Sequence, residues 1–525
     1  MGYGQAPHIL IVGGGYVGMY TALRLRRKLH GDEATITVVE PNSYMTYQPF
    51  LPEAAAGNLE PRHVVVPLRK VLKGCRIISG HVVMVSHEQR TASIQPLLGD
   101  AFDLKYDILV ICPGSVARTL PIPGLAEQGI GFKSAAEAIY LRNQVISRLD
   151  AAASATDAAV RRRALTFLFI GGGYAGIEAL AELEDMARDA CSYYPDLAPA
   201  DMRWVLVEAT GRILPEVSPA MGLYTVKQLE HRGIQVKLNT RVESLLDGNV
   251  VLDDGERFEA GTVVWTAGVK PNPMLARTDL PLDERGRLRA TAFLQVDGVA
   301  DAWTAGDCAA VPDLTKGEGA TTGPSAQHAV RQARRLAENL LAELRHEPIR
   351  PYEHSYAGSV ASLGLHKGVA EIYGVRLRGW PAWLMHRTYH LSRVPTVNRK
   401  ARVVADWTLA LFFRREIVSL GSFADPRAEF RRVATPASAP AAGTHAAPGM
   451  PAAVDGPAAD SAADSTADKA VPAASTFPGT PAAAPAPPGT PAPPPRRQRR
   501  TRRPRSGGAD RRPRPRAPPR PHGGR

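Results

Sequence analysis

One glycine-rich turn occurs twice in this chain of 525 residues, each time between a short apolar run and a helical stretch. The first copy is Gly13-Gly-Gly-Tyr-Val-Gly18, and the second is Gly171-Gly-Gly-Tyr-Ala-Gly176. In the spacing G-x-G-x-x-G, the first glycine permits a tight turn, the second lets a pyrophosphate approach the backbone, and the third lets helix and strand pack closely. Each copy is followed by a second apolar run that ends in a glutamate. The repeat therefore predicts two βαβ units.

The candidate nucleotide-binding residues are the motif glycines and the acid that ends each second strand. They are Gly13, Gly15, Gly18, Glu40, Gly171, Gly173, Gly176 and Glu208. The helix N-terminus after each turn would stabilise phosphate charge. An acid at the strand end accepts both ribose hydroxyls and repels a 2′-phosphate, so Glu208 favours NADH over NADPH. A single such motif is also compatible with a plain strand-to-helix corner, but two copies in the same context favour an α/β fold with two Rossmann-like dinucleotide-binding domains.

Further segments read as strands and one helix that complete these units. Residues 106–111 form an apolar run, and residues 302–304 form another one that leads into a Gly-Asp pair. Residues 249–252 and 262–265 flank an Asp-Asp-Gly turn, which predicts a hairpin and sheet-closing strands. Residues 325–344 predict a helix rich in Ala, Gln and Arg.

Composition divides the chain near residue 433. Residues 434–525 carry 14 basic and 5 acidic side chains, so most of the net charge of +13 lies there and the rest of the chain is close to neutral. An Ala/Pro/Gly/Ser/Thr run followed by an Arg/Pro run buries too little apolar surface to offset its ordering entropy, which predicts a disordered tail. The tail has three interpretations: a solvated extension, an electrostatic tether to anionic lipid, or a nucleic-acid arm. Because no aromatic residues are interleaved with its arginines, the nucleic-acid interpretation is the weakest.

The amino terminus and the cysteines argue against several kinds of segment and site. The amino terminus has no basic region before its short apolar run, so no signal peptide is predicted. The four cysteines lie far apart and form no mixed cluster with histidine, which argues against a disulfide scaffold, a metal site and a redox-active dithiol.

With a late Gly306-Asp307 motif after the second unit, the chain resembles the two-dinucleotide-binding flavoprotein family. Within that family it is similar to the type II, single-subunit and non-pumping NADH:quinone oxidoreductases. Three segments carry this second resemblance: Tyr47–Gly57, Val205–Pro215 and Val264–Val269. The resemblance spans about residues 7–425, and the dinucleotide motifs alone are specific only to the wider superfamily.

The resemblance implies FAD in the first unit and NADH as co-substrate in the second. FAD is expected against Gly13, Gly15, Gly18, Glu40 and Asp307, and we add Gly114, at the end of the apolar run 106–111, to these candidates. NADH is expected against Gly171, Gly173, Gly176 and Glu208. The expected domains are an FAD-binding domain in two parts, an NADH-binding domain inserted in it, a C-terminal interface or membrane-association region, and the tail. Their bounds are 7–150 and 286–345, 151–285, 346–433 and 434–525.

Three residues are candidates for the catalytic site. The acceptor-side signature of the resembled family, A-Q-x-A-x-Q on a helix, is matched by Gln327, but the position four later is Arg331. Gln332 is rotated by about 100° from it on the helix, and this departure leaves the identity of the acceptor open. Glu178 follows the last glycine of the second motif, where the family keeps a glutamate near the nicotinamide and the flavin; the alternative is an acid in the first helical turn, stabilised by the helix dipole.

The region 379–417 is rich in aromatic and arginine residues. Its longest apolar-rich stretch, residues 403–413, is too short to cross a bilayer, so no transmembrane helix is predicted. Its aromatic and basic side chains suit an amphipathic element at a membrane surface, while a dimer interface or a core helix is the alternative. The resemblance favours the membrane surface, from which type II enzymes draw quinone, and it also suggests a homodimer.

The hypothesis from the sequence is therefore a peripheral enzyme at the cytoplasmic face of the cell membrane. It would transfer hydride from NADH to FAD and two electrons on to a membrane quinone, without pumping protons. Two alternatives stay open: a soluble NADH-dependent flavoprotein reductase that uses a ferredoxin-like or other acceptor, and a redox-sensing binding protein.

Overall fold

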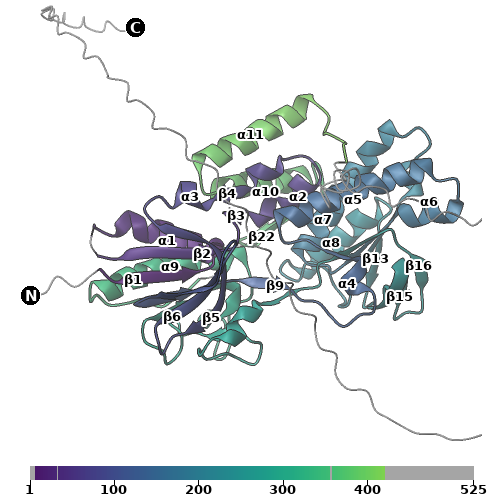
Figure 1. The fold of residues 1–525 in the computed structure, drawn as a ribbon. Helices are drawn as coiled ribbons and strands as arrows, with labels where there is room; N and C mark the ends of the chain where they lie inside the picture. Colours follow the sequence, from purple (N-terminus) through teal and green to yellow (C-terminus); the bar gives the residue numbers. More distant parts are fainter. Residues whose placement is uncertain (1–5, 32, 355–357, 420–525) are drawn as a thin grey trace, which may run out of the picture. The chain divides into compact units, whose positions relative to one another are not determined.

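The computed structural model describes residues 6–31, 33–354 and 358–419 (Figure 1). The described residues form several sheets with helices against them, and the predicted α/β class with two Rossmann-like units is confirmed. The predicted disordered tail, residues 434–525, lies outside the described residues.

The first large sheet has the strand order β20-β8-β1-β2-β5-β6-β7. Its central strands are parallel and almost wholly buried, as continuous Ile/Leu/Val runs require when both faces are covered. The strands β5, β6 and β7 extend it as an antiparallel meander. The bounds are β1 His8–Val12, β2 Thr35–Glu40, β5 Arg76–Ser86, β6 Thr91–Pro96, β7 Phe102–Lys105, β8 Ile108–Ile111 and β20 Ala302–Thr304.

Two helices far apart in the sequence pack together beside this sheet. They are α1, Tyr16–Lys28, and α9, Ala326–Leu344. The Thr21 hydroxyl donates to the Ala333 carbonyl at 3.3 Å, and Arg24 forms an ion pair with Glu338 at 2.6 Å. The helix predicted for 325–344 is therefore confirmed, and it completes the first unit although it lies 312 positions after the α1 residue that it contacts.

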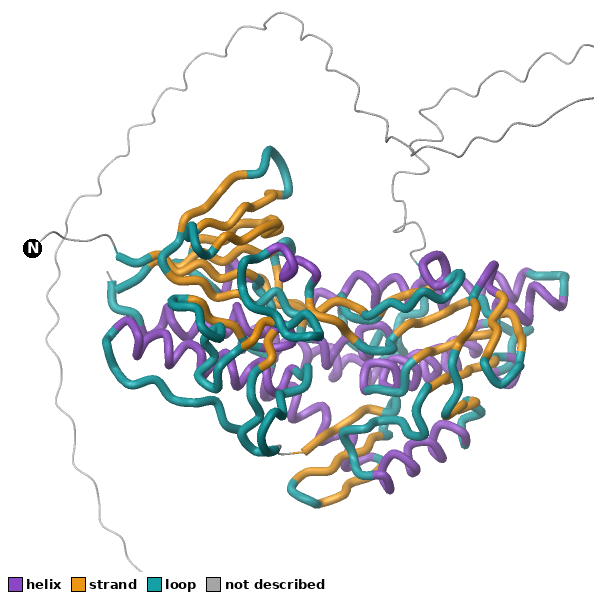
Figure 2. The backbone as a smooth tube through the Cα atoms, turned by 90° about the horizontal axis from the view of Figure 1, so that it is seen from below, coloured by secondary structure: helices purple, strands orange, loops and turns teal. Residues whose placement is uncertain are grey.

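The second large sheet is parallel throughout, in the order β10-β17-β11-β12-β13. Its strands are β10 Gly129–Gly131, β11 Thr166–Ile170, β12 Arg203–Glu208, β13 Gln235–Leu238 and β17 Thr262–Trp265. The helices of this half are α5 Ala135–Ser154, α6 Ala158–Ala164, α7 Tyr174–Ala190 and α8 Pro219–Glu230. Figure 2 shows helices (purple) running along the strands (orange) of both large sheets.

The hairpin predicted from residues 249–252 and 262–265 is wrong in its second strand, whereas the prediction that 262–265 is a strand of a sheet is confirmed. The Asp-Asp-Gly turn joins β15, Asn249–Leu252, to the short strand β16, Arg257–Glu259, and β14, Val242–Ser244, lies on the other side of β15. The segment Thr262–Trp265 is instead the buried strand β17, next to β11 in the parallel sheet. Its four consecutive buried residues suit a strand covered on both faces rather than a surface hairpin.

A three-stranded antiparallel sheet and two helices follow the first two units. The strands are β22 Gly358–Ser362, β23 Gly368–Ile372 and β24 Val375–Arg378, and the helices are α10 Trp380–Arg393 and α11 Val397–Phe412. Helix α10 packs on this small sheet. Among the described helices, none has the length and apolar content that crossing a bilayer requires.

The remaining helices and strands are short. They are β3 Tyr44–Thr46, α2 Leu51–Ala55, β4 Val65–Pro67, α3 Leu68–Val71, β9 Ser115–Ala117, α4 Leu125–Gln128, β18 Val269–Pro271, β19 Leu288–Arg289 and β21 Ala309–Ala310.

Candidate functional site

The three glycines of the first turn meet three different environments. Gly13 has a positive φ of 99°, and a Cβ on it would lie 2.5 Å from the Cys112 carbonyl oxygen. A Cβ on Gly18 would lie 1.8 Å from the Gly13 carbonyl oxygen, so the third glycine lets α1 pack against the turn. Apart from its chain neighbours and its own helix backbone, no atom of the described residues lies within 4 Å of a Cβ on Gly15. The second glycine therefore borders open space.

The second turn repeats this pattern. Gly171 has a φ of 113° with the Thr266 backbone 2.7 Å from its Cβ position, and Gly176 faces the Gly171 carbonyl oxygen at 2.1 Å. Gly173 again borders open space. Both Gly15 and Gly173 are the N-cap residues of their helices, and neither helix has a side chain that caps its first amides. Each turn thus presents free N–H groups beside an open volume, which fits a dinucleotide pyrophosphate.

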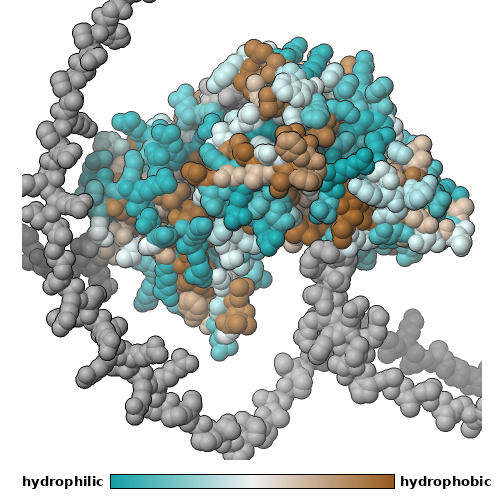
Figure 3. Space-filling view, turned by 90° about the horizontal axis from the view of Figure 1, so that it is seen from above, coloured by the Kyte–Doolittle hydropathy of each residue, from teal (hydrophilic) through white to brown (hydrophobic). Residues whose placement is uncertain are grey.

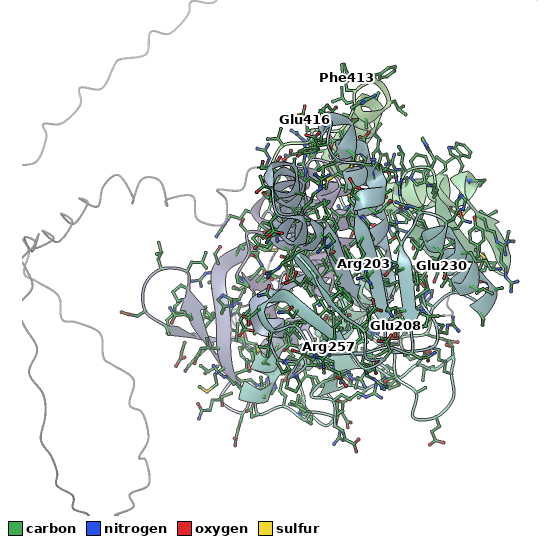
Figure 4. All side chains as sticks on the ribbon, turned by 90° about the vertical axis from the view of Figure 1, so that its right-hand side faces the viewer. Arg203, Glu208, Glu230, Arg257, Phe413 and Glu416 are labelled. Carbon is green, nitrogen blue, oxygen red and sulfur yellow. The ribbon has the colours of Figure 1, made fainter. Side chains whose placement is uncertain are left out.

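The two strand-end glutamates lie beside their turns. Glu40 Oε2 accepts the Gly14 N–H at 2.6 Å, and Glu208 Oε2 accepts the Gly172 N–H at 2.6 Å. Figure 4 labels Glu208. The other carboxylate oxygen of Glu208 accepts from the amide and the hydroxyl of Thr210, both at 2.8 Å. A carboxylate placed in this way can accept ribose hydroxyls next to a phosphate held by the turn.

The Gly306-Asp307 motif connects the ends of two neighbouring parallel strands of the first sheet, β20 and β8, through a hydrogen bond. Asp307 follows β20, and its Oδ2 accepts the Ser115 hydroxyl at 2.6 Å. The ammonium of Lys133 donates to the same hydroxyl oxygen, and burial lowers the pKa of Lys133. Gly114, at the end of the β8 run, has a φ of 72° and an open Cβ direction. Gln48, in a segment that carries the family resemblance, donates to the Lys133 carbonyl at 3.2 Å.

Helix α9 places its two glutamines in different surroundings. Gln332 is buried, its Oε1 accepts the Gly306 N–H at 2.7 Å, and its Nε2 donates to Thr322 at 3.1 Å. Gln332 therefore holds the backbone of the late motif. Gln327 donates to the Gly358 carbonyl at 3.4 Å, and Arg331 donates to the Gln327 carbonyl at 3.0 Å.

Two histidines stand beside Gln327 and Arg331. His354 Nε2 lies 3.1 Å from Gln327 Oε1, and His328 Nδ1 lies 2.9 Å from the Tyr352 hydroxyl. Burial, together with the nearby Arg331 charge, lowers the pKa of His354 to about 4. Burial also lowers the pKa of His328. Both imidazoles are therefore neutral at pH 7, and Arg331 supplies the positive charge of this cluster.

Glu178 lies in the second turn of α7, so stabilisation at the helix N-terminus is excluded as its role. The side chain is buried, its Oε1 accepts the Ser362 N–H at 2.9 Å, and it lies 3.1 Å from His386 Nε2. Burial disfavours a charged imidazole there, but the surrounding carboxylates outweigh this and raise the pKa of His386. Glu178 and Gln327 contact opposite ends of β22, about 13 Å apart along the strand. The structure thus does not bring these two candidates into contact.

A buried ion pair connects this region to the C-terminal helices. Glu53 of α2 accepts from Arg387 of α10 and from the Trp407 indole of α11, both at 2.8 Å. The Arg387 guanidinium also lies over the rings of Trp383, at 4.2 Å, and Trp407, at 4.8 Å. These two tryptophans and Arg387, predicted from composition to suit a membrane surface, therefore belong to the packing between helices.

Comparison with known proteins agrees with this geometry. The sequence signature of the pyridine nucleotide-disulphide oxidoreductase family matches residues 7–333. The solved structure of NDH2 from Plasmodium falciparum in complex with NADH has the same fold, with a TM-score of 0.72 and 17% identity, over 78% of this chain and 99% of that one. The chain belongs to the pyridine nucleotide-disulphide oxidoreductase family and is an NADH-dependent flavoprotein oxidoreductase.

Two relatives narrow the class of oxidoreductase. The type II NADH:quinone oxidoreductase of Staphylococcus epidermidis is 31% identical over 377 residues, which is 71% of this chain and 91% of that protein. A probable NADH dehydrogenase of Dictyostelium discoideum is 28% identical over 420 residues, or 78% of this chain and 91% of that protein. Within its family, the chain is thus a member of the type II NADH dehydrogenases.

Sequence reasoning missed several residues of these clusters. Lys133, His354 and His386 stand in no recognised motif, and each acquires its partners through chain segments far away in the sequence. A different role for Gln332 could have been predicted from the sequence. It is rotated by about 100° from Arg331 on the helix, so it must face a different neighbour.

Proposed function

We propose that this enzyme passes the electrons of NADH through FAD to a quinone dissolved in the membrane, without pumping protons. The observation that carries the quinone proposal is the outward apolar face of α11. Val403, which points into the protein, is the one buried residue of this helix. The opposite face carries a stripe of small and apolar residues that face solvent: Val397, Ala401, Val404, Thr408, Leu411 and Phe412.

This stripe is strongly exposed for its composition. Val397 is 83% exposed, Leu411 is 73% exposed and Phe412 is 77% exposed. Figure 3 views the side of the molecule from which α11 projects, and apolar side chains (brown) group there among polar ones (teal). An apolar face on a helix that also carries Arg399, Lys400 and Arg402 is suited to lie in the plane of a membrane interface. An enzyme docked in this way has direct access to a lipid-soluble acceptor.

We assign FAD to the first glycine turn and NADH to the second. Glu40, Asp307 and Gly114 complete the FAD site, and Glu208 completes the NADH site. When bound, FAD supplies the two-electron chemistry that joins a hydride donor to a quinone. The helix N-termini hold the pyrophosphates, and Gln332 keeps the late motif in position. The assignment makes 7–150 and 286–345 the FAD-binding domain, 151–285 the NADH-binding domain, and 346–433 the membrane-association region.

We place the acceptor side at Gln327 and Arg331, with Glu178 on the nicotinamide side. The Gln327 amide and the neutral His354 can donate to a carbonyl oxygen, and Arg331 adds a positive charge that favours electron-rich quinone oxygens. A homodimer and a position at the cytoplasmic face of the membrane are also part of the proposal. Both of these rest on the resemblance to type II enzymes.

The test is anaerobic stopped-flow spectroscopy of the full chain, with flavin absorbance as the signal. NADH should reduce the flavin, and a short-chain quinone should then reoxidise it rapidly. Gln327→Ala should slow reoxidation at least tenfold and leave reduction by NADH unchanged. Arg334→Ala, an exposed change on the same helix, is the matched control. Reduction by NADH without reoxidation by quinone would refute quinone as the acceptor and favour a reductase that serves another acceptor.

A further inference from the structure

A groove of about 470 Å³ lies where α11 begins, between that helix, α1 and the β4–α3 segment. Its lining combines apolar and basic side chains. The apolar lining is Leu23, Pro67, Val71, Val394, Pro395 and Val397, and the basic lining is Arg27, Lys70, Arg399 and Lys400. Among the described residues, no acidic side chain lines it.

The four basic side chains have no carboxylate partner among the described residues. Arg399 donates to the Arg62 carbonyl and Lys400 to the Ser392 carbonyl, both at 2.7 Å, so these two cations are positioned by neutral groups. Arg27 and Lys70 are exposed on the other side of the groove. In contrast, the neighbouring Arg24 is paired with Glu338. Four unneutralised cations around one groove therefore select for an anion.

The start of α11 adds to the positive potential. Thr396 is the N-cap of this 16-residue helix, its hydroxyl accepts the Arg399 N–H at 3.2 Å, and the first turn contains no acid. The positive end of the helix dipole is thus not compensated by a side chain of that turn.

The groove is continuous with the apolar stripe of α11. Val397 lines the groove and is also the first residue of the stripe. A ligand that fits both surfaces has an anionic head next to apolar chains. A small inorganic anion would use the cations but leave the apolar lining and the stripe uncovered.

We propose that the groove binds the phosphate headgroup of an anionic phospholipid, with the acyl chains next to the α11 stripe. This inference rests on the membrane contact in the proposed function and adds a lipid class to it. A headgroup bound in the groove lies between α11 on one side and α1 and α3 on the other. This position determines which side of α11 meets the bilayer.

The test is partition of the full chain into vesicles at physiological salt, with phosphatidylcholine alone or with phosphatidylglycerol added. The variant Arg27→Gln/Lys70→Gln removes two groove cations and leaves α11 and the tail unchanged. Each basic residue near an anionic surface strengthens membrane binding. Loss of both residues is therefore expected to lower the partition coefficient about thirtyfold. The control is Arg257→Gln/Arg285→Gln, two exposed arginines outside the groove with no ion pair in the described part of the chain; Figure 4 labels Arg257.

The groove variant should lose about thirtyfold in binding to phosphatidylglycerol vesicles and bind phosphatidylcholine vesicles as the wild type does. Native mass spectrometry should show a phosphatidylglycerol molecule bound to the wild type and to the control, but not to the groove variant.

Equal losses of vesicle binding in both double variants would assign the effect to long-range attraction and overturn the groove as the binding site. Equal binding of the wild type to both vesicle types would also overturn it, while membrane docking would stand. A wild type that binds neither vesicle would overturn docking as well, and quinone reduction would then be judged by the stopped-flow test alone.

Discussion

Glu182 is a buried carboxyl group whose titration should control the stability of the fold near neutral pH. The side chain is 1% exposed, its Oε1 accepts the Ser362 hydroxyl at 2.7 Å, and its Oε2 accepts the Asn58 amide at 3.1 Å. Burial and the nearby Glu53 raise the pKa of Glu182 from 4.5 to about 7. Two neutral donors do not compensate for the lost hydration of a charged carboxylate.

The direction of the pH effect follows from proton binding. Between pH 4.5 and about 7 the folded chain holds a proton on Glu182 that the unfolded chain has released. The free energy of unfolding therefore falls as the pH rises through this window. At about 1.4 kcal/mol for each pH unit, the stability lost between pH 4.5 and about 7 is about 3 kcal/mol, and it stays lost at higher pH.

Glu182→Gln should remove this loss, because the neutral amide keeps a hydrogen-bonding side chain of the same size. In urea unfolding followed by far-UV circular dichroism, the variant and the wild type should agree at pH 5. At pH 8 the variant should unfold at a urea concentration higher by about 0.5 to 1 M. Glu230→Gln, an exposed change in α8 that Figure 4 labels, is the control and should change neither midpoint. A Glu182→Gln protein that is less stable than the wild type at pH 8, or equally shifted at both pH values, would refute the reasoning.

Three further changes test the two nucleotide sites. Gly173→Ala places a methyl group in the open space beside the second turn, so the thermal midpoint should stay the same while the KM for NADH rises at least tenfold. Glu208→Ala removes the charge that repels a 2′-phosphate, so the ratio of kcat/KM for NADH over NADPH should fall at least tenfold in steady-state assays. Lys133→Met removes the buried cation next to Asp307 and should lower the FAD content of the purified protein, measured by its visible absorbance. Lys133→Arg keeps the charge and should retain FAD. Equal FAD content in both variants would exclude a role for this charge.

The elements that were predictable from the sequence are those with local causes. The positive φ of Gly13 and the close approach of Gly18 to the Gly13 carbonyl both lie within six residues, so the motif was sufficient to place the strand before the turn and the helix after it. The helix predicted for 325–344 is observed at 326–344, because its apolar periodicity is a property of one segment. The hairpin failed because pairing partners are chosen by register and burial: residues 262–265 pair with a strand almost a hundred residues earlier rather than across the nearest turn.

The sequence by itself determined the α/β class, the two dinucleotide turns and the family, because each is written in short-range patterns of glycine and apolar residues. Tertiary structure alone decided the partners of the charged side chains. Glu53 meets Arg387 across 334 positions of sequence, and Gln332 turns to the late motif instead of continuing the row of Gln327. It also decided that Trp383 and Trp407 are packed between helices while Val397 and Leu411 face outward. The physical reason is that burial and charge pairing depend on which distant segments share a surface, and composition does not encode that choice.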